Sequence, residues 1–114
     1  MVKLKKMSNS ETSNITTAGE EHVEKWLSGN GYNSIIKDTT GPGPEAIEAN
    51  GTLENILVMV KTAVTPNQPV EITRAQQNTI KTRAEQSARK AYVAYVIIDA
   101  NKDLVGEIMW ERIG

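Results

Sequence analysis

The chain has 114 residues, a net charge of −1, no cysteine and one histidine, His22. This length suits one domain with its own hydrophobic core. Without cysteine, thiol nucleophiles, cysteine-ligated zinc and iron–sulfur clusters are excluded, so any metal must be a hard cation bound by oxygen ligands. No apolar run approaches about twenty residues and no secretory signal core is present, so we expect a soluble, cytoplasmic protein with no membrane partner.

The charges are unevenly distributed along the chain. Residues 1–10 carry +3, residues 11–60 carry −6, residues 61–90 carry +4, and the remainder carries −2. This segregation indicates a basic face beside an acidic pocket, and a basic face can bind nucleic acid. The candidate DNA-binding residues in the second basic segment are Arg74, Lys81 and Arg83. A solvated charged face without a binding role is the alternative.

The first part of the chain divides into an arm and a helix. Residues 1–14 mix lysine with polar residues and show no apolar periodicity, which predicts a disordered basic arm, whereas residues 15–114 are expected to form a single domain. A capping box formed by Thr17 and Glu20 predicts a helix that begins near Thr17 and ends near Gly29. Its glutamate lies at the edge of the apolar stripe, although an N-terminal glutamate also suits the helix dipole without any site.

Three strands are expected next, the last two as a hairpin. The first spans residues 31–37 and follows the turn that ends the helix. The second begins at Glu45, because the prolines just before it favour extended backbone. After a turn at Asn50-Gly51, residues 56–60 are apolar on both faces, as in a strand covered on two sides. Strand alternation places Met59 and Lys61 on one face, so Lys61 is expected near Glu45.

The rest of the chain predicts one helix and two strands. A second capping box at Thr73 begins a helix that is expected to continue to about Lys90. Residues 91–98 are apolar on both faces and predict a central strand that is parallel to a strand before the helix. Residues 104–109 are expected to form a last edge strand. The predicted fold is α/β, with a mixed central sheet flanked by helices and an extra C-terminal strand.

The order α-β-β-β-α-β resembles the restriction-endonuclease-like core of the PD-(D/E)XK nuclease superfamily, with closest similarity to Mrr-type restriction enzymes and archaeal Holliday-junction resolvases. In that family, a glutamate of the first helix precedes a Gly-Tyr pair, as Glu20 precedes Gly31-Tyr32 here. An acid opens the second strand, as Glu45 does. The third strand ends in an acid or glutamine, any residue and a lysine, where this chain has Met59-Val60-Lys61.

The resemblance implies a DNA-processing protein and names its site. Glu20, Glu45 and Lys61 would be the catalytic residues, and Mg²⁺ would be held by Glu45 and the carbonyl group of Val60 while the lysine activates water. This sequence departs from the family pattern, because Glu45 replaces the usual aspartate and Met59 stands where the family has an acid or glutamine. A thioether does not bind Mg²⁺, so the resemblance implies a weak or degenerate Mg²⁺-dependent endonuclease that binds DNA.

Another interpretation stays open. Lys61 can instead protect an edge strand against pairing while Glu45 is an ordinary surface acid. The chain would then be a non-catalytic structural or protein-interaction module, which a homodimer formed through its last strand would suit. Whether Glu20, Glu45 and Lys61 converge in the folded protein distinguishes this interpretation from the nuclease site.

Overall fold

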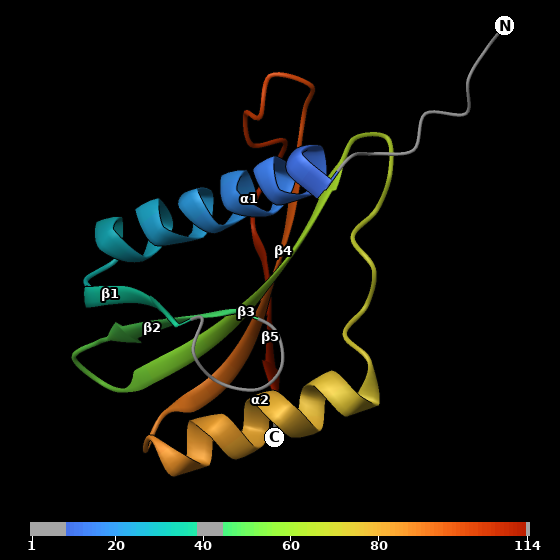
Figure 1. Cartoon of the computed structure of the whole chain (residues 1–114). Helices are drawn as coiled ribbons and strands as arrows, with labels where there is room; N and C mark the ends of the chain where they lie inside the picture. Colours follow the sequence, from blue (N-terminus) through green and yellow to red (C-terminus); the bar gives the residue numbers. More distant parts are fainter. Residues whose placement is uncertain (1–8, 39–44, 114) are drawn as a thin grey trace, which may run out of the picture.

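The computed structural model describes residues 9–38 and 45–113. In these residues the elements follow the order α1 (Asn9–Gly29), β1 (Asn33–Asp38), β2 (Ala46–Asn50), β3 (Asn55–Val64), α2 (Arg74–Gln86), β4 (Lys90–Ile98) and β5 (Met109–Ile113). The sheet lies between the helices, with α1 on one face and α2 on the other (Figure 1). The predicted α/β fold with a flanked sheet and an extra last strand is therefore confirmed.

The strands lie in the sheet in the order β1-β2-β3-β4-β5. β3 and β4 are parallel and are joined through α2, whereas the other neighbouring pairs are antiparallel. The hairpin predicted for β2 and β3 is present, with Ile47 opposite Val58. β5 lies at the edge of the sheet, as expected for the last strand, and β3 is an interior strand.

Two apolar clusters hold the layers together. Beneath α1, Val23 and Leu27 pack with residues of β2, β3 and β4, including Val58. On the other face, α2 contributes Ile80 and Ala84 to a cluster with Leu57, Met59 and Val93. β3 and β4 place alternate side chains in the two clusters, which explains why both strands are apolar on both faces.

The first helix is longer than the sequence indicated. α1 begins at Asn9, so residues 9–14 of the predicted disordered arm are helical, and residues 1–8 lie outside the described part of the chain. The predicted start at Thr17 is wrong because the apolar stripe continues toward the N-terminus. Ile15 packs against the cluster beneath α1, and Ala18 is buried in it.

Two other predicted boundaries also differ from the structure. α2 ends at Gln86 rather than near Lys90, because Ala88 has a φ of 57° and takes the chain out of the helix. The last strand is Met109–Ile113 rather than residues 104–109, because Gly106 has a φ of 72° and interrupts the extended backbone before it. Among the described helices, none is long and apolar enough to cross a membrane.

Candidate functional site

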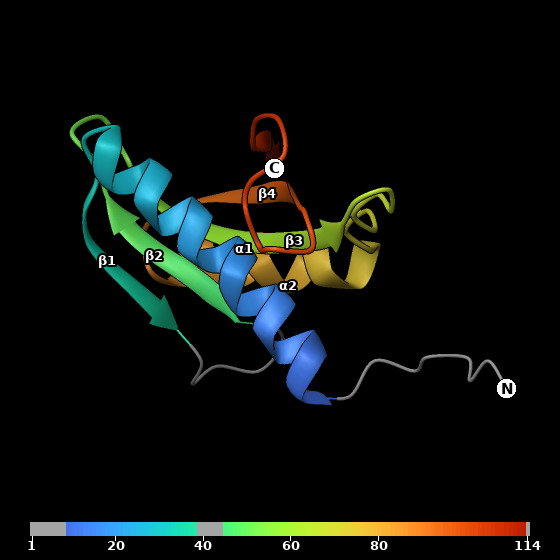
Figure 2. The ribbon, with the colours of Figure 1, turned by 90° about the horizontal axis from the view of Figure 1, so that it is seen from above.

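A cavity of about 250 Å³ lies where α1 meets the end of β1, the residue before β2 and the middle of β3. The pairing of the strands explains its position. β2 begins at Ala46, and the part of β3 beyond Val58 has no partner residue in β2. Figure 2 shows α1 crossing the sheet above this region. Its lining residues are Thr16, Thr17, Glu20, Lys37, Glu45, Met59 and Val60.

Glu20 is the buried acid of this cavity. It lies on the inward face of α1 and is only 3% exposed. The ammonium of Lys37, from β1, lies 3.1 Å from Glu20 Oε1. The two side chains form an ion pair across the cavity. A charge buried in this way requires a charged partner, and Lys37 is that partner.

The charges in the cavity influence one another. Burial raises the pKa of Glu20 above its ordinary value, and the nearby Glu45 carboxyl group acts in the same direction, while Lys37 opposes both. The contact with Glu20 raises the pKa of Lys37. The site is thus two neighbouring carboxyl groups and one ammonium group, of which Glu20 is buried and Glu45 is exposed to solvent.

Three of the predicted site residues meet in this cavity, since Glu20, Glu45 and Val60 all line it. Lys61 does not. Val60 packs toward the α1 cluster and Met59 belongs to the α2 cluster, so strand alternation places Lys61 on the α2 face. The predicted convergence of Lys61 with the two glutamates is therefore wrong, because the face it shares with Met59 is not the face of Glu20.

Lys61 has a different environment from the one expected. Its Cα is paired with that of Tyr95 on β4, and burial lowers the pKa of its amine. The alternative that Lys61 protects an edge strand stays a prediction, because β3 lies between β2 and β4 in the sheet but beyond Val58 pairs only with β4. No described side chain forms an ion pair with Lys61.

Lys37 is the site residue that sequence reasoning missed. It stands at the end of the apolar pair Ile35-Ile36, and a basic residue at a strand end is unremarkable by itself. The structure gives it a role because β1 pairs with β2, where Lys37 lies opposite Ile47, beside the strand entry at Glu45. That register could not be read from local residue patterns.

The donor set does not fit a Mg²⁺ ion. Mg²⁺ requires octahedral oxygen coordination, but here the ammonium of Lys37 already neutralises Glu20. Met59 offers a thioether, and it is 3% exposed and packed among apolar side chains. Within residues 9–38 and 45–113, no group of three or more histidine, aspartate or glutamate side chains is placed to hold a metal.

The predicted DNA-binding residues all belong to α2. Arg74 and Lys81 are exposed, and Arg83 is half-buried. Lys81 lines a second cavity of about 250 Å³ at the end of α2, together with Ala84, Glu85, Arg89, Lys90, Ala91, Arg112 and Ile113. Arg89 is held in place by an ion pair with Glu48 at 3.5 Å and by a hydrogen bond to the Ala49 carbonyl oxygen at 3.1 Å. This surface has four basic side chains and one acid.

The arrangement of helices and strands defines a nuclease-like α/β fold. A solved structure with this fold is that of Archaeoglobus fulgidus Hjc, a Holliday junction resolvase from an archaeal hyperthermophile, which superposes with a TM-score of 0.60. The two chains are 16% identical, and the match covers 86% of this chain and 72% of Hjc. No protein-family model and no curated protein sequence matches the chain. The similarity to Hjc establishes the fold, and function must be argued from the site.

Proposed function

We propose that this protein binds DNA and is a degenerate relative of metal-dependent nucleases. The observation that supports this proposal best is the ion pair between Lys37 and Glu20 at 3.1 Å. A nuclease site of this fold would need its carboxylates free to bind a metal ion, and here an amino-acid cation neutralises the buried one. The chain keeps the nuclease-like fold while its cavity lacks the ligand set for hydrolysis.

The position of Lys61 supports the same conclusion. The expected mechanism uses a lysine beside the carboxylates to orient water, but Lys61 lies on the face of the sheet that α2 covers. Lys37 is engaged with Glu20 and its pKa is raised by that contact, so it is poorly suited to accept a proton from water. We therefore expect little or no phosphodiester cleavage.

Binding to DNA is supported by the basic surface at the end of α2. Lys81 and Lys90 line one cavity there, and no described acid forms an ion pair with either of them. Arg74 and Arg83 add positive charge along the same helix. Such side chains contact phosphate oxygens without reading base sequence, so the proposed binding is largely independent of sequence.

Fluorescence anisotropy and gel assays test this function together. The full chain is titrated against labelled duplex DNA and a four-way junction, with EDTA, Mg²⁺ or Mn²⁺. Binding that is present in EDTA and no cleavage with either metal is the expected result. Metal-dependent cleavage would contradict the degenerate site, and absence of binding to every DNA would remove DNA as a partner. The second candidate function, a protein-interaction module, would then be favoured by the acidic groove described below.

A further inference from the structure

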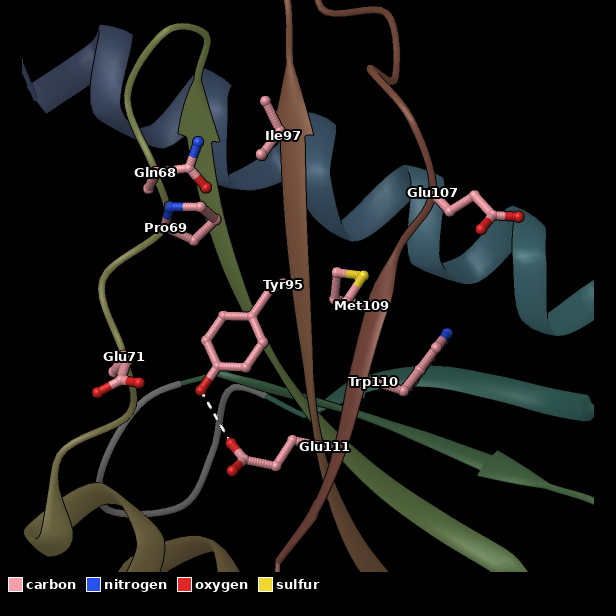
Figure 3. A pocket seen from close by; sticks show the side chains of 9 residues that line it. All are labelled: Gln68, Pro69, Glu71, Tyr95, Ile97, Glu107, Met109, Trp110 and Glu111. Atoms are coloured by element: carbon pink, nitrogen blue, oxygen red, sulfur yellow. Dashed lines mark hydrogen bonds between the residues drawn. The ribbon is translucent and has the colours of Figure 1, made fainter.

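A groove of about 480 Å³ lies on the α2 face of the sheet, beyond the N-terminal end of α2 (Figure 3). One wall is the segment that leads into α2, the floor is β4, and the other wall is β5 with the residues before it. The lining residues are Gln68, Pro69, Glu71, Tyr95, Ile97, Glu107, Met109, Trp110 and Glu111. This groove is on the opposite face of the sheet from the cavity of Glu20.

The centre of the groove is apolar and partly open to solvent. Tyr95 and Ile97 project from β4 and are half-buried, and Tyr95 packs against the border of the α2 cluster. Met109 stands beside them on the edge strand and is 66% exposed. A large apolar side chain left open at the mouth of a groove marks a candidate binding surface.

The rim of the groove is acidic. Glu71 and Glu107 lie on its two flanks, and Glu111 lies below Tyr95 in Figure 3. No lysine or arginine lines the groove, and the side chains of Glu71 and Glu107 form no ion pair or hydrogen bond with a described residue. Of the three carboxylates around the groove, that of Glu111 is hydrogen-bonded to Tyr95 of the floor. Together the three create a negative potential that attracts cations.

Tyr95 is fixed in the middle of this charge arrangement. Its hydroxyl group donates a hydrogen bond to Glu111 Oε1 at 3.0 Å and accepts one from the Ile72 backbone N–H at 3.3 Å. Burial raises the pKa of Tyr95, and the acidic neighbours Glu111 and Glu71 add to this effect. Tyr95 is therefore held by two hydrogen bonds between acidic side chains, while the neighbouring residue on β3 is the basic Lys61.

We propose that this groove binds an extended, lysine- or arginine-bearing segment of a partner protein. The apolar floor would contact the aliphatic parts of the segment, and its cationic ends would pair with Glu71, Glu107 and Glu111. Charge complementarity selects this occupant, because a DNA backbone would be repelled by the three carboxylates. The inference is independent of the DNA-binding proposal, which concerns the basic surface at the C-terminal end of α2.

The probe is a fluorescein-labelled hexapeptide of alternating lysine and leucine, titrated against the full chain at low salt. A hexapeptide of alternating glutamate and leucine tests the charge requirement. We expect only the cationic peptide to bind, and Glu71→Gln/Glu107→Gln to weaken it by about fivefold, as lost surface ion pairs allow. The double variant Glu21→Gln/Asp103→Asn makes the same change of charge at exposed positions outside the groove and should leave binding unchanged.

A second pair of variants tests the apolar floor. Met109→Ser should weaken the cationic peptide, whereas Leu53→Ser should not, although Leu53 is 98% exposed. No peptide binding, or equal losses in groove and control variants, would overturn the proposal. Sedimentation showing that the groove variants abolish self-association would also overturn it. The groove variants should retain DNA binding, so failure of this inference and failure of the DNA-binding proposal are distinguishable.

Discussion

At the scale of single residues, Lys37 decides what the cavity can do. Its ammonium lies 3.1 Å from a glutamate that is almost fully buried, so it supplies the positive charge that the two carboxyl groups require. A divalent ion could reach Glu20 and Glu45 only if Lys37 moved away. Once that ammonium group is removed, the two carboxyl groups are expected to bind a divalent cation.

Replacement of Lys37 by glutamine is therefore expected to create cation binding. Lys37→Gln leaves Glu20 beside Glu45 without a compensating charge, which should destabilise the metal-free fold by about 1–2 kcal/mol, given that Lys37 is partly exposed. Mn²⁺ at about ten times its dissociation constant should return about 1.4 kcal/mol to the variant. Thermal melts with and without Mn²⁺ measure both effects.

Two controls accompany the Lys37→Gln variant. Lys37→Gln/Glu20→Gln lacks the buried carboxylate and should gain nothing from Mn²⁺. Lys25→Gln removes an exposed lysine of α1 that does not line the cavity and should behave as the parent does. If the parent gains as much stability from Mn²⁺ as Lys37→Gln does, Lys37 does not exclude the metal.

The sequence was sufficient to place the two glutamates of this cavity, but it was insufficient to identify the lysine that accompanies them. Glu20 could be placed from helix periodicity, and Glu45 from the prolines that precede its strand. The choice between Lys37 and Lys61 depends on which face of β3 meets α1. Because one residue of register exchanges the faces of a strand, local patterns that correctly grouped Leu57 with Met59 could not say which helix covers them.

At the scale of elements, the close contact between α1 and β3 positions Glu20. Gly19 precedes Glu20 on the helix, and a Cβ atom at Gly19 would overlap Thr62 Oγ1 and lie 2.8 Å from Thr62 Cβ. Distances this short require the helix or the strand to move. The glycine therefore allows α1 to approach the sheet and bring the carboxyl group of Glu20 to Lys37.

Gly19→Ala is expected to lower the free energy of unfolding by about 1–3 kcal/mol, because it forces overpacking between α1 and β3. Gly29→Ala is the matched control in the same helix, since a Cβ there would meet nothing within 4 Å and alanine favours helix. Urea denaturation of both variants measures the difference. Equal stability of Gly19→Ala and Gly29→Ala would contradict the close contact.

The two capping boxes show where local prediction of elements succeeds and fails. At Thr73, the hydroxyl oxygen accepts a hydrogen bond from the Gln76 N–H at 3.1 Å, and α2 begins as predicted. At Thr17, the same pattern lies inside α1, because Ile15 and Ala18 bury apolar surface on the sheet. Packing energy therefore overrides a cap, which contributes only about 1 kcal/mol.

At the scale of the whole molecule, opposite charges lie on separate surfaces. The basic cavity at the end of α2 contains Lys81 and Lys90, whereas the groove beyond the other end of the helix is lined by three glutamates. The net charge of −1 conceals this separation. A polyanion should therefore approach one region of the protein and avoid the other.

The salt dependence of DNA binding tests this charge arrangement. Each phosphate contact contributes about 0.9 to the slope of log affinity against log salt for duplex DNA, so Lys81→Gln/Lys90→Gln should reduce the steepness of that slope by about 2. Lys25→Gln/Lys102→Gln removes the same charge from exposed positions outside the basic cavity and should change the slope little. Anisotropy titrations at several salt concentrations give the slopes. If the two double variants lose affinity and slope equally, DNA responds to total charge, and the basic surface at the end of α2 has no special part in binding.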